Sequence, residues 1–175
     1  MRFTDKVVVI TGAAQGIGRQ TAEQAAAEGA ALLLIDRSSY VHELAATLAQ
    51  SGCLVLALEA DLEAWESTEQ AFAAGVAHFG RIDVLINNAQ ASASGIPLAI
   101  QTKDHFDLGM YSGLYATFYY MRECYPYLKE TQGSVINFAS GAMDAEAGQR
   151  QHRQHFVGGD GGSESGAVLG GERRR

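Results

Sequence analysis

Cysteine, positive charge and long apolar runs are all scarce in this sequence. Only two cysteines occur, Cys53 and Cys124, and their spacing fits no metal site, so we expect free thiols in a reducing compartment. The 13 Lys and Arg residues against 20 Asp and Glu give a net charge of −7, which argues against a nucleic-acid partner. No apolar segment is long enough to span a membrane, and the first residues lack the apolar core of a signal peptide. We therefore expect a cytoplasmic protein with no metal site and no membrane or nucleic-acid partner.

The apolar residues that are present form short, nearly continuous runs at residues 7–10, 30–35, 53–58, 84–86 and 135–139. Such runs are typical of strands that are covered on both faces in a parallel sheet. Helix-like stretches lie between them, and Gly29, Gly52 and Gly80 follow three of these stretches, where helices end in a left-handed residue. The 175 residues therefore predict an α/β domain, a doubly wound parallel sheet with strand order 3-2-1-4-5. Its ligand crevice should lie at the carboxyl ends of strands 1 and 4.

The composition changes after residue 142. Seven of the fourteen residues from 158 to 171 are glycine, and no helix or strand period is visible between residues 143 and 175. A segment of this kind buries too little apolar surface to offset the entropy lost on ordering. We expect an ordered domain over residues 1–142, with later strands missing, and a disordered, non-native tail over residues 143–175. The fifth strand would then be a bare edge.

Three glycines, Gly12, Gly16 and Gly18, lie between the first apolar run and the first helical stretch. The N-terminus of a helix exposes backbone N–H groups that bind anions, and glycines let a pyrophosphate approach the backbone closely. The order strand, glycine turn, helix therefore predicts a dinucleotide-binding unit. A glycine triplet alone is weak evidence, so residues after the later strands must support it.

Acidic residues end the second and third predicted strands. Asp36 lies 18 residues after Gly18, where a carboxylate accepts both hydroxyls of the adenosine ribose and repels a 2′-phosphate, which favours NAD over NADP. The neighbouring Arg37 could instead hold that phosphate. Asp61 can contact the adenine amino group or cap the helix that starts near Ala64, and both roles can hold together.

Polar residues also follow the fourth and fifth strands. Asn87 and Asn88 can hydrogen-bond neighbouring strands and a cofactor ribose, although asparagine is also an ordinary turn residue. Ser140 ends the fifth strand, where a hydroxyl can orient a substrate carbonyl or alcohol. A serine in that position can equally serve as a helix cap or turn residue.

Together these motifs make residues 3–141 resemble the short-chain dehydrogenase/reductase family. The resemblance rests on the glycine segment 11–18, the pair 61–62, the segment 87–89 and Ser140, in this order and spacing. It implies a Rossmann fold, a homo-oligomer, and hydride transfer between NAD, with NADP less favoured, and a small-molecule secondary alcohol, ketone or cyclic diol. The start of the chain is similar to cis-diol dehydrogenases of aromatic-acid breakdown. Reductases of β-oxoacyl carrier proteins and sugar or polyol dehydrogenases are alternative relatives.

The resemblance also implies roles for individual residues. Asp36 would bind the adenosine ribose, and Asp61 and Leu62 the adenine. Asn88 and Ala89 would lie on the nicotinamide side. The pyrophosphate would be held by Gly12, Gln15, Gly16, Ile17 and Gly18.

The chain departs from the family pattern at the acid/base residues. Ser140 would position the substrate oxygen, and the family places a Tyr and, four residues on, a Lys in the following helix to move the proton. Here the last tyrosine is Tyr127 and the last lysine is Lys129. The usual offset from Ser140 falls near Arg153, whose guanidinium stays protonated at working pH.

The chain departs from the family pattern at two further places, and these bear on the function that we expect. A family asparagine that supports a proton relay falls at Ser112 or Gly113. After Gln149 the resemblance ends in a stretch rich in Gly, Arg and Gln, which we interpret as a frameshift product. Helix 106–129 packs in the family's subunit interface, so its apolar side chains predict association or aggregation. We expect dinucleotide binding with little or no turnover, and the alternative function is a non-catalytic dinucleotide-binding or interaction protein.

Overall fold

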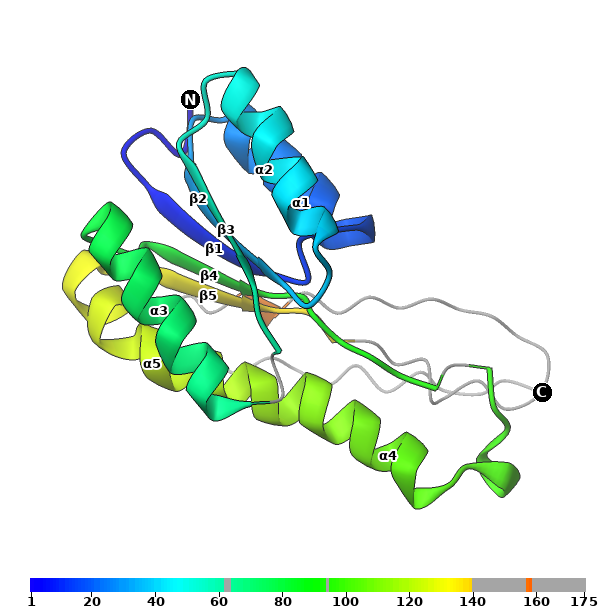
Figure 1. The fold of residues 1–175 in the computed structure, drawn as a ribbon. Coiled ribbons are helices and arrows are strands. Elements are labelled where there is room, and N and C mark those ends of the chain that lie inside the picture. Colours follow the sequence, from blue (N-terminus) through cyan, green and yellow to red (C-terminus); the bar gives the residue numbers. More distant parts are fainter. Residues whose placement is uncertain (62–63, 94, 140–156, 159–175) are drawn as a thin grey trace, which may run out of the picture.

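The computed structural model describes residues 1–61, 64–93, 95–139 and 157–158. Its centre is a sheet with strand order β3-β2-β1-β4-β5-β6 (Figure 1). Five of these strands are parallel, namely β1 (Val7–Thr11), β2 (Ala31–Asp36), β3 (Val55–Glu59), β4 (Val84–Asn87) and β5 (Ser134–Asn137). The predicted doubly wound sheet and its order 3-2-1-4-5 are confirmed.

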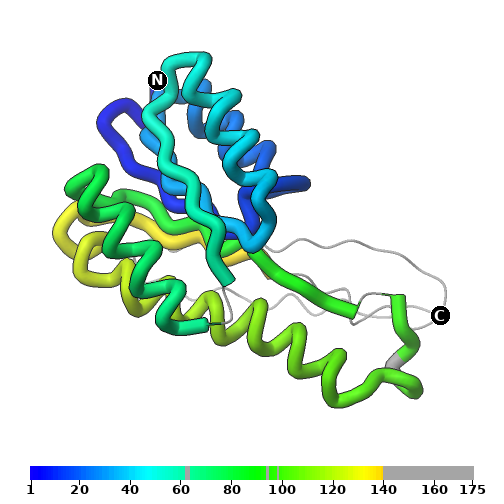
Figure 2. Tube along the Cα trace, viewed as in Figure 1, coloured from blue at the N-terminus to red at the C-terminus, as the bar shows by residue number. Residues whose placement is uncertain are grey.

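Helices cover both faces of this sheet (Figures 1 and 2). One face carries α1 (Gly16–Ala27) and α2 (Tyr40–Gln50), and the other carries α3 (Trp65–Phe79) and α5 (Ala116–Thr131). Successive residues of a strand point to opposite faces. Val8 and Ile10 therefore pack in one apolar cluster, while Val9 packs with Phe72 and Tyr120 in the other. Burial on both faces is why each strand is a continuous apolar run.

Left-handed glycines end three of the helical segments, as the sequence predicts. Gly29, Gly52 and Gly80 have φ values of +91°, +89° and +74°. Only glycine adopts this region without a steric penalty, so each glycine lets the chain turn back toward the next strand.

The single helix predicted over residues 106–129 is interrupted. The structure has α4 (Lys103–Gly109), a π-helical turn η2 (Met110–Tyr115) and then α5, after a short 3₁₀ turn η1 (Leu98–Ile100). α4 begins earlier than expected because Thr102 and His105 form a capping box, in which each side chain accepts the other's backbone N–H. At η2 the Ser112 hydroxyl bonds back to the Leu108 carbonyl at 2.6 Å. A side chain that competes for helix carbonyls in this way distorts the regular ladder.

The edge of the sheet also differs from the expectation. A two-residue strand, β6 (Val157–Gly158), pairs antiparallel with Ile136 and Asn137 of β5. An edge strand presents unpaired N–H and C=O groups that readily take up another segment, which gives the physical reason for the extra strand. Residues 140–156 and 159–175, and with them most of the tail predicted to be disordered, lie outside the described residues. Within the described residues, no helix combines the length and apolar character needed to cross a membrane.

A buried carboxylate ties β1 to β4 at the amino ends of the strands. Asp83 is 3% exposed and accepts hydrogen bonds from the Val7 N–H at 3.0 Å, from Lys6 Nζ at 3.0 Å and from Arg81 Nε at 2.8 Å. Burial raises the pKa of Asp83, but the bonds from Arg81, Val7 and Lys6 outweigh burial and hold that pKa below its ordinary value. The cluster therefore favours the folded state when the carboxyl is ionised.

We expect this cluster to make the free energy of unfolding fall at acidic pH. Because the folded-state pKa of Asp83 is lowered, its contribution is present above the unfolded pKa of about 3.9 and is lost as pH falls through the folded-state pKa. The variant Asp83→Asn should lose about 2 kcal/mol of unfolding free energy at pH 7. It should also show a flatter dependence on pH below about pH 4. Urea unfolding between pH 3 and 7 measures both effects.

The control is Glu28→Gln, which removes an exposed ion pair with Arg2 and should change stability little. Parallel pH profiles for the wild type and Asp83→Asn would contradict this account of the cluster.

Candidate functional site

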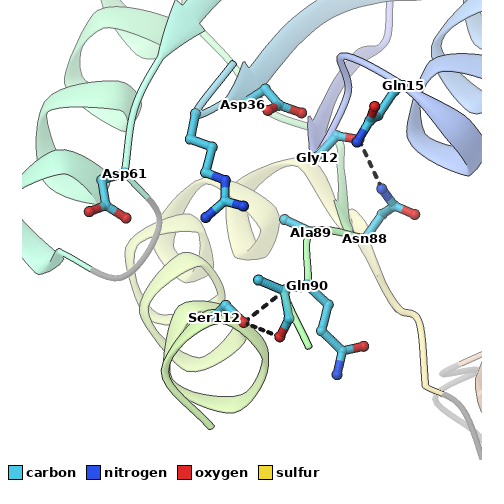
Figure 3. A pocket seen from close by; sticks show the side chains of 10 residues that line it. Gly12, Gln15, Asp36, Asp61, Asn88, Ala89, Gln90 and Ser112 are labelled. Atoms are coloured by element: carbon cyan, nitrogen blue, oxygen red, sulfur yellow. Dashed lines mark hydrogen bonds between the residues drawn. The ribbon is translucent and has the colours of Figure 1, made fainter. Parts of the chain in front are cut away.

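A cavity of about 240 Å³ lies at the carboxyl ends of β1 and β4 (Figure 3). The strand order reverses here, because β1 has β2 on one side and β4 on the other. The lining residues are Gly12, Gln15, Asp36, Arg37, Asp61, Asn88, Ala89, Gln90, Ala91 and Ser112. Six of the residues predicted to bind cofactor therefore meet in one cavity, which opens where the sequence predicted the crevice.

The glycine turn forms one wall of the cavity and is packed too tightly for side chains. A Cβ at Gly18 would lie 2.1 Å from the Gly12 carbonyl oxygen, and a Cβ at Gly12 would lie 2.8 Å from the Cα of Ala89. At Gly16 the opposite holds, since a Cβ there would meet no atom within 4 Å. Space that only a glycine leaves open, beside the start of α1, fits the close approach of a phosphate group.

The N-terminus of α1 has no anionic group of its own. Its N-cap residue, Gln15, makes no side-chain capping bond, and the first turn of the helix contains no acidic residue. The first N–H groups of α1 and the positive end of its dipole are thus available for a bound anion. This is the property that a pyrophosphate site requires.

Hydrogen bonds join the glycine turn to the loop after β4. Asn88 Nδ2 donates to the Gly12 carbonyl at 3.1 Å (Figure 3) and to the Thr11 carbonyl, also at 3.1 Å. In return, Thr11 Oγ1 accepts the backbone N–H groups of Asn88 and Ala89, also at 3.1 Å. Four hydrogen bonds therefore link the two walls, and Thr11, which the sequence did not single out, takes part in three of them.

Asp36 lies at the other end of the cavity and also holds the turn. It is 9% exposed, and its two carboxylate oxygens accept the N–H groups of Ala14 and Ser38, each at 2.9 Å. A carboxylate has about four acceptor positions, so capacity remains for two hydroxyl groups of a ligand. The adjacent Arg37 lines the same cavity and is exposed.

The remaining predicted residues are placed as follows. Asp61 lines the cavity, but the N-cap position of α3 is taken by Ala64, so Asp61 does not occupy it. Gly16, Ile17 and Gly18 form the first turn of α1 beside the cavity. Leu62 and Ser140 lie outside the described residues.

The described lining of the cavity offers few of the side chains that commonly transfer protons or attack substrates. Asp36 and Asp61 supply carboxylates, and none of the described lining residues is a Tyr, Lys, His or Cys. Burial raises the pKa of Cys124 to about 12 and also raises that of Cys53, so neither thiol is activated as a nucleophile. No group of three or more His, Cys, Asp or Glu that could hold a metal occurs within the described ranges.

Two lining residues gain a role only from the structure. Ser112 and Gln90 reach the cavity from η2 and from the loop after β4. The sequence identified Ser112 only as a position where the expected asparagine is absent, and nothing in the local pattern marked Gln90. Both positions depend on packing between segments that are far apart in the chain.

Comparison with known proteins identifies the family to which this chain belongs. A family model described as short chain dehydrogenase matches residues 6–151. A 12α-hydroxysteroid dehydrogenase from a Clostridium species is 59% identical over 151 residues, which cover 80% of this chain and 57% of the relative. The 1,6-dihydroxycyclohexa-2,4-diene-1-carboxylate dehydrogenase of Pseudomonas putida is 40% identical over 140 residues, covering 79% and 52% respectively.

The solved structure of a short chain dehydrogenase/reductase from Burkholderia phymatum in complex with NAD matches with a TM-score of 0.73 and 26% identity. The match covers 78% of this chain and 50% of that one. The chain thus spans about half the length of the relatives that it matches.

Proposed function

Since this chain belongs to the short-chain dehydrogenase family, we propose that its cavity binds NAD for hydride transfer to or from a small-molecule alcohol or ketone. The observation that carries the proposal is the pairing of two features in one cavity. Asp36 offers free acceptor positions at one end, and the uncapped start of α1 offers N–H donors beside it. A ribose diol next to a pyrophosphate is the ligand that complements this pair.

When bound, the nicotinamide would supply or accept the hydride. The chain's own residues would hold the cofactor: Asp36 at the adenosine ribose, Gly12 and Gly16 at the pyrophosphate, and Asn88 and Ala89 on the nicotinamide side. Asp61, with Leu62 beside it, would contact the adenine, and Ser140 would orient the substrate oxygen. The free thiols of Cys53 and Cys124 are consistent with a cytoplasmic location.

For the substrate class we propose a secondary alcohol or its ketone, with a hydroxysteroid as the first compound to test. The relative at 59% identity is named for a hydroxysteroid, and the relative at 40% for a cyclic diol. A cyclic diol is therefore the second compound. Because no Tyr or Lys follows Lys129, we propose that this chain binds cofactor with little or no turnover. A non-catalytic dinucleotide-binding or interaction protein remains the alternative function, and binding without turnover would favour it.

Calorimetric titration with NAD⁺ and NADP⁺ tests the choice of cofactor. We expect the wild type to prefer NAD⁺, because the Asp36 carboxylate repels a 2′-phosphate. The variant Asp36→Asn should bind NAD⁺ roughly 10-fold more weakly and should lose most of the preference, since it removes the charged acceptor. The ratio of the two affinities is the readout, because a general loosening of the glycine turn would lower the affinity for both cofactors by the same factor.

Arg37→Ala is the matched control for this titration. If Asp36 sets the preference, Arg37→Ala should leave NAD⁺ affinity and the cofactor ratio nearly unchanged. A wild type that bound NADP⁺ more tightly, with that advantage lost in Arg37→Ala, would show that Arg37 holds a 2′-phosphate and would refute the assignment of NAD.

We also propose that the chain associates with itself through the outer face of α4, η2 and α5. The sheet-facing side of α5 is buried, whereas large apolar side chains on the other side are 39–63% exposed. They are Phe106, Tyr111, Leu114, Tyr115, Phe118, Met121 and Tyr125. Large exposed apolar side chains that recur along one helical segment are typical of an interface or of aggregation.

The double variant Leu114→Asp/Phe118→Asp should therefore convert associating protein into monomer, because two charges would be desolvated at the contact. Light scattering after size-exclusion chromatography measures the change. Tyr40→Asp, on α2 at the opposite face of the sheet, is the control and should leave association intact. A wild type that stays monomeric and melts cooperatively would contradict this proposal.

A further inference from the structure

The loop after β4 is fastened to η2 by one buried hydroxyl (Figure 3). Ser112 is 6% exposed, and its Oγ accepts the N–H of Ala91 at 2.9 Å. The hydroxyl proton lies between two acceptors, the carbonyls of Ala91 at 2.9 Å and of Leu108 at 2.6 Å. Both polar backbone groups of Ala91 are thus satisfied by a side chain 21 residues away, and the loop cannot shift without breaking these bonds.

Gln90 directly precedes Ala91 in the loop after β4, and its side chain lies at the cavity. Gln90 is exposed and lines the cavity together with Ala91 and Ser112. Its side chain lies over Gly113, where an added Cβ would be 3.7 Å from both the Cγ and the Nε2 of Gln90. A side chain larger than that of alanine at position 113 would therefore compete with Gln90 for this space. Among the described residues, the Gln90 carboxamide has no hydrogen-bond partner, so its two N–H donors and its oxygen acceptor are available to a ligand.

The order of groups along the cavity indicates what this carboxamide meets. Around the cavity from Asp61, the labelled residues come in the order Asp36, Gly12 with Gln15, Asn88 and Gln90 (Figure 3). A dinucleotide with its adenosine ribose at Asp36 and its pyrophosphate at the glycine turn has its second nucleoside toward Gln90. That nucleoside carries ribose hydroxyls and a carboxamide, which both donate and accept hydrogen bonds.

We propose that Gln90 is a ligand-contacting residue that hydrogen-bonds the nicotinamide riboside half of the cofactor, and that Ser112 is the positioning residue that holds it in place. The inference rests on the proposed function and names a contact that the function alone does not require. Gln90 is effective because the Ser112 bonds fix its backbone before the ligand arrives, so less conformational entropy is lost on binding.

The test compares NAD⁺ with ADP, which has the adenosine and both phosphates but no nicotinamide riboside. In calorimetric titrations, Gln90→Ala should weaken NAD⁺ binding about 5- to 10-fold and leave ADP binding unchanged. Ser112→Ala should weaken NAD⁺ in the same selective way, because the loop loses its anchor. Ser112→Thr keeps the hydroxyl and should restore NAD⁺ affinity, a rescue that mere loss of packing would not show.

Gly113→Ala is the control, since its methyl group fits at 3.7 Å and should leave both affinities unchanged. Equal affinities of Gln90→Ala and the wild type for NAD⁺ would overturn the inference while leaving NAD binding established. An equal loss of NAD⁺ and ADP affinity in Gln90→Ala would also overturn it. A wild type that binds neither ligand would instead refute the proposed function, and this inference with it.

Discussion

A chimera that joins residues 1–139 of this chain to the remaining part of the 12α-hydroxysteroid dehydrogenase relative should oxidise a 12α-hydroxysteroid with NAD⁺, whereas this chain alone should show no measurable turnover. The described cavity residues are those that we propose bind the cofactor, and they include no Tyr, Lys, His or Cys to move a proton. General acid or base catalysis contributes about 10²- to 10⁴-fold, so we expect at least this difference in turnover between the chimera and this chain. NADH production followed at 340 nm would measure both proteins.

The junction is chosen so that both sides of the cofactor site stay intact. The relative is 59% identical over 151 residues, a match that includes β5. We therefore expect β5 of this chain to pack against the relative's C-terminal part as the relative's own strand does. A chimera that also carries Gly18→Ala is the control and should be inactive, since its cofactor site is damaged. Turnover by this chain alone within tenfold of the chimera would contradict the assignment of little or no activity.

Gly18→Ala should abolish NAD⁺ binding, with a loss of at least about 100-fold, and should destabilise the fold by about 2–3 kcal/mol. The added Cβ would lie 2.1 Å from the Gly12 carbonyl oxygen and 2.6 Å from Asn88 Nδ2. These atoms belong to the glycine turn and to the hydrogen bonds between its two walls, so relief of the clash must open the cavity wall. Titration with NAD⁺ and urea unfolding measure the two losses.

Gly109→Ala provides the matched control on another helix. An added Cβ at Gly109 would meet no atom within 4 Å, and alanine is favoured over glycine in a helix by up to about 1 kcal/mol. We expect this variant to bind NAD⁺ like the wild type and to be as stable or slightly more stable. If Gly18→Ala behaved in the same way, the close packing of the glycine turn would have no role in binding.

Much of the fold could be predicted because its signals are local. Each parallel strand is a continuous apolar run, and Gly29, Gly52 and Gly80 mark where helical segments end. The interruption at η2 was missed because the helical pattern continues through it, and only the bonds of Ser112 to Ala91 and Leu108 distort it. The start of α4 was missed because histidine is an unusual partner for threonine in a capping box.

The candidate site was predicted less completely, for a related reason. The sequence identified Asp36 and Asn88 through their positions after strands. It did not show that Thr11 reciprocates the bonds of Asn88 from 77 residues away, or that Gln90 lies over Gly113. These contacts exist because η2 packs beside the loop after β4 and because β1 and β4 are neighbours in the sheet.

The sequence by itself determined the strands and the glycine turn, since apolar periodicity and glycine's conformational freedom act within a few residues of chain. The order of the strands followed from the alternation of strands and helices, which is typical of a doubly wound sheet. Only the tertiary structure decided how the cavity is held together and which groups face a ligand. Hydrogen bonds such as those of Asn88 to Gly12 and of Ser112 to Ala91 join segments distant in the sequence, and they form only after burial of apolar surface has brought those segments together.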